Sequence, residues 1–156
     1  MENSFFNIFR NPCFWGPFLS WLVAQCTKML CNFINTRKLD FGYLVSTGGM
    51  PSAHSAMSSG LATAVGLVAG FHTPVFAMTL AFALLVMFDA ATVRRAAGQQ
   101  ARLLNEIVAE MFRDHRFSEK KLAELLGHTR LEVFMGMIIG ILTSMIVVFN
   151  SSSVQL

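Results

Sequence analysis

The chain has 156 residues, of which 54% are hydrophobic and only 13% are charged, with a net charge of +3. Soluble domains carry about 25% charged residues, so this composition excludes an ordinary water-soluble domain and indicates a protein of the lipid bilayer. The length allows one domain. Residues 1–156 are therefore expected to form a single membrane domain, with membrane lipids around it and no nucleic-acid partner.

Four segments approach the roughly 20 apolar residues that a helix needs to cross a membrane. They cover residues 13–34, 53–71, 74–93 and 131–149. Only His72 and Thr73 separate the second segment from the third, which predicts a tight antiparallel hairpin. The expected fold is an all-α integral membrane bundle of about four transmembrane helices. Pairs of glycines four residues apart, Gly66–Gly70 and Gly136–Gly140, predict close helix packing.

A polar stretch over residues 94–130 separates the third segment from the fourth. Its apolar residues recur at spacings of four and three, which is the helical period; they are Ala97, Ala101, Leu104, Val108 and Met111. The pattern predicts an amphipathic helix over about 95–113, lying on the membrane surface or against the bundle. A second short helix is expected over about 118–126, so this cytoplasmic loop holds one or two helices.

The basic residues predict the orientation, because Lys and Arg concentrate in cytoplasmic loops. Ten of the twelve follow the first or the third segment; these are Arg37, Lys38, Arg94, Arg95, Arg102, Arg113, Arg116, Lys120, Lys121 and Arg130. Both termini are therefore expected outside, with the basic loops in the cytoplasm.

Ionisable residues inside membrane segments are costly and mark candidate functional sites. Lys28, His54, Asp89, His128 and Glu132 are such residues. With the predicted topology, all five fall at one depth near the cytoplasmic face. Scattered polar residues of a membrane core would have no reason to share a level.

The second segment begins with GGMPSAH, residues 48–54. Glycines such as Gly49 permit positive φ and close backbone approach, and Pro51 suits the first position of a helix. The N–H groups of that helix start can bind an anion, with Ser52 and His54 adding side-chain donors. The alternative is a plain helix start with a capping serine and a histidine without function.

Two further groups lie beside the third and fourth segments. His128 and Glu132 are four residues apart, so they share a helix face, and a carboxylate bonded to one ring nitrogen makes the other more nucleophilic. The alternative is a turn followed by an acid in a first helical turn. Asp89 precedes Arg94 and Arg95, whose guanidinium groups match phosphate oxygens; the alternative is that these arginines only anchor the helix at the cytoplasmic face.

Two histidines, several cations and a helix N-terminus favour phosphoryl chemistry. One histidine attacks phosphorus, the other protonates the leaving oxygen, and the cations hold the equatorial oxygens. Because the predicted site opens at the headgroup level of the cytoplasmic leaflet, a lipid phosphate is the expected substrate.

These residues carry a resemblance to a known group. PSAH at 51–54, DAATVRRAAGQQARLLNE at 89–106 and LGHTRLEVFMG at 126–136 resemble the small divergent membrane branch of the type-2 phosphatidic acid phosphatase and vanadium-dependent haloperoxidase superfamily. The resemblance covers roughly residues 20–145. It implies that His128 is the nucleophile, His54 the acid and Glu132 the orienting carboxylate, with Lys28 and Ser52 binding phosphate.

The chain departs from the superfamily pattern at two arginines. Asn35 stands where the first motif has Arg, and Leu122 stands where the third motif has Arg. Arg94 or Arg95 can supply the missing charge from another helix. Asp89 has no counterpart in the main motifs; it can orient an arginine, or bind a divalent cation together with Glu132.

The leading hypothesis is a membrane lipid phosphatase, a hydrolase of a phosphomonoester or pyrophosphate headgroup, working through a phosphohistidine at His128. Catalysis is assigned to His128, His54 and Glu132, phosphate binding to Lys28, Arg94, Arg95, Ser52 and Gly49, and a supporting role to Asp89. No cofactor or metal is assigned. The alternatives are a non-catalytic lipid-phosphate binder or transporter, and a structural membrane protein; a homodimer is left open.

Overall fold

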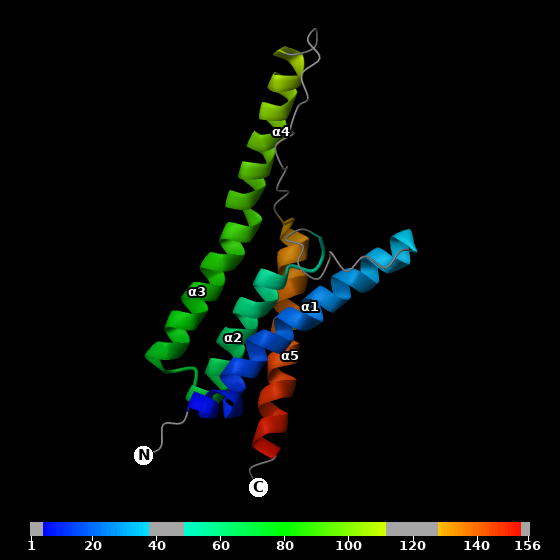
Figure 1. Ribbon diagram of the computed structural model, residues 1–156. Helices are drawn as coiled ribbons and strands as arrows, with labels where there is room; N and C mark the ends of the chain where they lie inside the picture. Colours follow the sequence, from blue (N-terminus) through cyan, green and yellow to red (C-terminus); the bar gives the residue numbers. More distant parts are fainter. Residues whose placement is uncertain (1–4, 38–48, 112–127, 154–156) are drawn as a thin grey trace.

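The computed structural model describes residues 5–37, 49–111 and 128–153 (Figure 1). These residues form a short 3-10 helix, η1 (Phe5–Arg10), and the α-helices α1 (Pro12–Thr36), α2 (Ala53–Ala69), α3 (Pro74–Ala91), α4 (Val93–Met111) and α5 (Arg130–Ser153). No strand occurs among them, so the predicted all-α class is confirmed. The short helix expected over 118–126 lies outside the described residues.

Side-chain caps set where three of the helices begin. The side chain of Asn11 accepts from the N–H of Cys13 at the start of α1. Ser52 and Thr73 accept in the same way at the starts of α2 and α3. Each cap satisfies an N–H group that the first helical turn leaves without a partner. The caps place the helix starts within two residues of the starts that the apolar segments predict.

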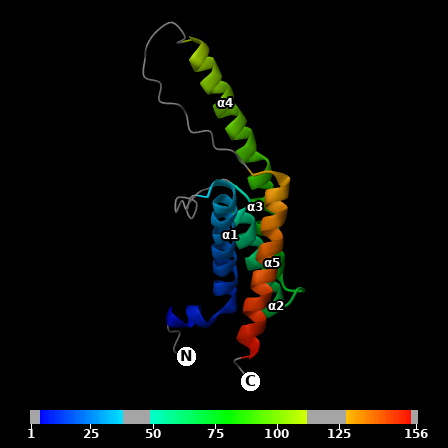
Figure 2. The ribbon, with the colours of Figure 1, turned by 90° about the vertical axis from the view of Figure 1, so that its right-hand side faces the viewer.

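Helices α1, α2 and α5 pack against one another and form the centre of the bundle (Figures 1 and 2). Along α5 every fourth residue is buried, namely Gly136, Gly140, Ser144 and Val148. A Cβ added at Gly140 would collide with the carbonyl oxygen of Ala56, and one at Gly136 with that of Ser52. The Gly136–Gly140 pair therefore allows backbone-to-backbone packing of α5 on α2, as predicted.

The Gly66–Gly70 pair has a different role. A Cβ at Gly66 would meet the rings of Phe71 and Phe76, and Gly70 ends α2 with φ of +95°. These glycines therefore shape the short α2–α3 turn rather than a helix–helix contact, because the rings of the turn fold back over the end of α2.

Helix α3 lies at the edge of the bundle and packs mainly on α2. Only 11% of the residues of α3 are buried, and Val75, Met78, Leu85 and Phe88 are all more than half exposed. A soluble protein rarely exposes so much contiguous apolar surface, so this face suits the acyl chains of a bilayer. Among the described helices, α3 and residues Arg130–Ser151 of α5 are long and apolar enough to cross a membrane.

The predicted count of four spans is not reproduced by that criterion. Helix α2 has only 17 residues and is rich in serine, and α1 carries the polar residues Gln25 and Lys28 in its second half. Length and hydropathy alone therefore single out two helices.

Helix α4 continues α3 almost without a break and projects beyond the end of the bundle (Figure 1). The N–H of Thr92 donates to the carbonyls of Phe88 and Asp89, and its own carbonyl accepts from Ala96. Of the described elements, α4 contacts α3 alone. It does not lie against the bundle, since helical hydrogen bonding passes through the junction and carries the chain onward.

The two ends of the bundle differ in chemistry. The described ends nearest the termini lie at one end, together with the α2–α3 turn (Figure 2). An aromatic cluster of Phe9, Phe14, Trp15 and Phe18 is found there, and the Trp15 indole N–H donates to the Phe9 carbonyl at 2.8 Å. Such aromatic groups favour the membrane–water interface. The polar residues singled out from the sequence lie toward the other end, where α2 and α5 begin and α3 ends.

Candidate functional site

His128 lies just before α5 and is only 1% exposed. Its Nδ1 atom is 2.9 Å from Oε2 of Glu132. Since a carboxylate accepts, Nδ1 is the donor in this contact, which in the neutral ring leaves the lone pair on Nε2. The Nε2 atom is buried and has no hydrogen-bond partner among the described residues. A buried ring nitrogen without a partner calls for an explanation, and a ligand atom facing it is one.

Glu132 is held from two sides. Its Oε2 also accepts from the backbone N–H of Thr129 at 3.1 Å, and its own N–H donates to Thr129 Oγ1 at 3.3 Å. This reciprocal pair is a capping box. The carboxylate therefore caps α5 and orients His128 at the same time. The hydrogen bond to His128 and the acid in the first helical turn, which the sequence offered as alternatives, are both present in Glu132. The spacing T-x-x-E was the signal that could have singled out Thr129.

Backbone hydrogen bonds tie this group to the neighbouring helices. The N–H of Ser52 donates to the Glu132 carbonyl at 3.0 Å, and the N–H of His128 donates to the Ala90 carbonyl at 3.2 Å. Lys28 of α1 is 3% exposed and has an electrostatic interaction with Glu132. The start of α5 is therefore held against α2 and α3, and the buried lysine of α1 interacts electrostatically with its carboxylate.

Ser52 and Gly49 lie at the entry to α2. Ser52 is fully buried, and its hydroxyl accepts from the N–H and the hydroxyl of Ser55. This is the capping serine that the sequence offered as the plain alternative. Gly49 has φ of +85°, a conformation that favours glycine. Phosphate binding by either residue stays a prediction.

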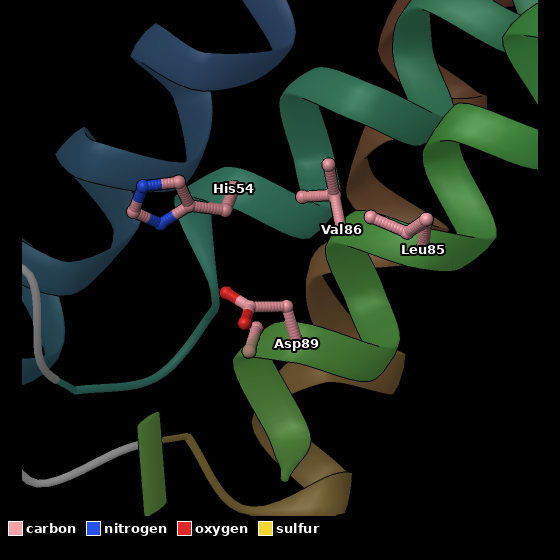
Figure 3. A pocket seen from close by; sticks show the side chains of 5 residues that line it. His54, Leu85, Val86 and Asp89 are labelled. Carbon is pink, nitrogen blue, oxygen red and sulfur yellow. The ribbon is translucent and has the colours of Figure 1, made fainter. Parts of the chain in front are cut away.

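His54 and Asp89 line a cavity of about 180 Å³ together with Leu85, Val86 and Ala90. In Figure 3 the polar ends of His54 and Asp89 lie on one side, and Leu85 and Val86 lie on the other. Ala90 also accepts the hydrogen bond from His128. The cavity therefore adjoins the backbone of His128 and has a polar side and an apolar side.

Arg94 and Arg95 fall in the first turn of α4, just past Asp89 and Ala90. Their side chains lie outside the described part of the chain, so their binding of phosphate stays a prediction. No group of three or more metal-ligating side chains occurs among the described residues.

Gln25 was missed by the sequence analysis. It is 4% exposed, and its Oε1 atom is buried without a hydrogen-bond partner among the described residues. The sequence feature that could have singled out Gln25 is its position three residues before Lys28 within an apolar segment. Residues at this spacing share a helix face.

Comparison with known proteins identifies the family. The model of the Divergent PAP2 family matches residues 9–143. This chain belongs to that family. The chain is also 41% identical over 148 residues to the "Uncharacterized membrane protein YuiD" of Bacillus subtilis (strain 168), covering 85% of this chain and 94% of the relative. No solved structure matches.

The divergent PAP2 match spans every residue assigned to the site. It runs from η1 into the second half of α5 and so includes Lys28, His54, Asp89, His128 and Glu132. The resemblance seen in three short motifs is thus confirmed over most of the chain.

Proposed function

We propose that this divergent PAP2 family protein is a membrane lipid phosphatase that works through a phosphohistidine at His128. The observation that carries the proposal is the state of the ring: Nδ1 is bonded to Glu132, and Nε2 is buried without a partner among the described residues. A carboxylate that fixes the tautomer and supports the developing imidazolium is the standard activation of a histidine nucleophile.

The reaction takes two steps. In the first, Nε2 of His128 attacks phosphorus, the bond from phosphorus to the lipid oxygen breaks, and His54 donates a proton to that oxygen. In the second, His54 removes a proton from water, whose oxygen attacks phosphorus, and the phosphorus–nitrogen bond breaks to release inorganic phosphate. The substrate is a phosphomonoester or a pyrophosphate, because both give a protonated oxygen leaving group.

Asp89 supports His54 in this scheme. Both line one cavity, and their polar ends lie on the same side in Figure 3. A carboxylate near an imidazole favours its protonated form, which the first step requires. Lys28 acts beside Glu132, where its charge offsets that of the carboxylate, and Arg94 and Arg95 supply charge to the phosphate.

The direct test is turnover by the purified full chain in detergent micelles. Phosphate release should be measured from phosphatidic acid, phosphatidylglycerophosphate, an isoprenyl phosphate and an isoprenyl pyrophosphate, with and without vanadate. We expect release from at least one of them and inhibition by vanadate, which mimics the five-coordinate transition state. No release from any of the four lipids would overturn the proposal.

A non-catalytic lipid-phosphate binder is the second candidate. It is favoured by Asn35 and Leu122, which stand at two positions where the superfamily pattern has arginine. Such a protein binds the same lipids saturably and releases no phosphate. A binding assay on the same panel therefore separates the two candidates, since only the enzyme converts the bound lipid.

The proposed topology has four spans, with α1 and α2 crossing the membrane alongside α3 and α5. The support is that α1, α2 and α5 pack along one another, so a bilayer that holds α5 also surrounds its neighbours. The aromatic end then lies outside and the site faces the cytoplasm, on the side of α4 and most of the basic residues.

This topology predicts cysteine accessibility. With the native Cys13, Cys26 and Cys31 replaced by alanine, single cysteines are introduced by Asn7→Cys in η1 and Gln100→Cys on the exposed face of α4. A membrane-impermeant maleimide should label the first in intact cells and the second only after permeabilisation. Labelling of both in intact cells would contradict the assignment.

The orienting carboxylate gives a kinetic prediction. Glu132→Gln should lower kcat by about 100-fold, because the neutral amide no longer stabilises the imidazolium that forms at His128. The measurement is phosphate release at saturating lipid. Thr129→Ser is the matched control: it keeps both hydrogen bonds of the capping box and should retain activity within about twofold. Equal activity of Glu132→Gln and the wild type would remove Glu132 from the mechanism.

A further inference from the structure

Gln25 is a buried polar group that the proposed mechanism does not use. It is 4% exposed on α1, and Oε1 is buried without a hydrogen-bond partner among the described residues. A buried carbonyl without a partner is destabilising, and native structures retain few such groups. Together with His128 Nε2, Gln25 Oε1 is one of two buried side-chain atoms of this kind in the described part of the chain.

The position of Gln25 along the bundle follows from the contacts of α1. Ser20 bonds to the Gly140 carbonyl and lies near Ser144 on α5. One turn later, Ala24 packs with Ala53 and Ala56 near the start of α2. One turn later again, Lys28 interacts with Glu132. Successive turns of α1 thus approach the site step by step.

Gln25 precedes Lys28 by three residues, which is about 4.5 Å along the helix axis. Both are buried and share a face of α1. Lys28 interacts electrostatically with Glu132, the carboxylate bonded to His128. Gln25 precedes Lys28 by about one turn, toward Ala24 and Ser20, which pack at the centre of the bundle. In a lipid whose phosphate faces His128, the atoms one turn deeper are those that link the phosphate to the tail.

We propose that Gln25 contacts this linking part of the substrate and so selects glycerol-based lipid phosphates over isoprenoid phosphates. The inference rests on the proposed function. A glycerol-based lipid places a hydroxyl or an ester carbonyl there, and a carboxamide can accept from the first or, when rotated, donate to the second. An isoprenoid chain places only hydrocarbon there and leaves the buried amide unpaired. Sites built around a hydrogen bond strongly reject analogues that lack the partner.

The test compares two substrates of the full-length protein in matched detergent micelles, phosphatidic acid and farnesyl phosphate. For the wild type, kcat/KM should be at least about 100-fold higher for phosphatidic acid. Gln25→Met keeps a side chain of similar length without the amide. It should lower kcat/KM for phosphatidic acid by about 10- to 100-fold and change that for farnesyl phosphate by less than about twofold.

Cys26→Ala is the matched control, because Cys26 is the neighbouring residue on the exposed side of α1; it should change neither value. If Gln25→Met does not purify as folded protein, Gln25→Asn, which keeps the amide but shortens its reach, should show the same selective loss. Equal losses on both substrates, or a wild type that prefers farnesyl phosphate, would overturn the inference and leave the phosphatase intact. Turnover of isoprenyl pyrophosphate alone would overturn only this inference. Absence of turnover on all four lipids of the panel would overturn the proposed function and this inference with it.

Discussion

Replacement of His128 by asparagine should lower phosphate release from the preferred lipid by at least about 10³-fold, because the attacking nitrogen is lost. The variant should also form no phosphoenzyme when the reaction is quenched in base, where phosphohistidine survives. Asparagine is a suitable replacement since the hydrogen bond from the backbone of residue 128 to Ala90 does not depend on the side chain.

His54→Asn is the comparison that separates the two histidines. With a lipid substrate it should lower kcat by about 10²- to 10⁴-fold, the usual contribution of a general acid. The leaving group of para-nitrophenyl phosphate needs no proton. With this substrate, His54→Asn should form the phosphoenzyme almost as well as the wild type, and His128→Asn should form none. Recovery by His128→Asn instead would reverse the two roles. If both variants still form the phosphoenzyme, the phosphohistidine mechanism is excluded.

Gly140→Val should prevent stable folding of the bundle. A Cβ at this position already collides with the Ala56 carbonyl and the Ser59 hydroxyl, and valine adds two methyl groups. Because α2 and α5 pack backbone to backbone here, no rotamer relieves the clash, and we expect a loss beyond the usual 1–3 kcal/mol or so for overpacking. The measurements are yield of monodisperse protein in detergent and the midpoint of thermal unfolding.

Ala81→Val is the control for this substitution, since Ala81 is exposed on α3 and the added methyl groups meet lipid or detergent. Its unfolding midpoint should stay close to that of the wild type. A Gly140→Val protein as stable as Ala81→Val would mean that α2 and α5 do not approach closely at this level.

Much of this architecture could be predicted from local sequence. Apolar runs, together with Thr73 before the third run and Pro74 at its first position, indicate where helices start and stop, because caps and prolines act within one turn. The i, i+4 spacing of His128 and Glu132 is likewise a local property. The Gly136–Gly140 pair predicts a packing face, but only the structure gives its partner on α2.

Features that depend on relations between helices could not be predicted. The apolar period of α4 is the same whether the helix lies on the bundle or extends beyond it, so its direction was beyond sequence reasoning. Lys28 was assigned to phosphate, which stays a prediction, and its electrostatic interaction with Glu132 was not foreseen. Asp89 was considered as a partner of arginine or a cation, and it shares a cavity with His54. Each outcome depends on which helices pack against each other, and a single sequence does not contain that information.

The shortness of α2 has a consequence for the path of a lipid. Its 17 residues extend about 26 Å at 1.5 Å per residue, less than the roughly 30 Å of hydrocarbon in a typical membrane. Ten of these residues are buried, and α1, α3 and α5 all pack against the helix, so neighbouring helices rather than lipid surround most of α2. With α2 crossing as proposed, one of its ends stops short of the headgroup level while α1 and α5 continue past it. If that end is the first turn, where His54 lies, a lipid phosphate reaches it by moving inward between the helices.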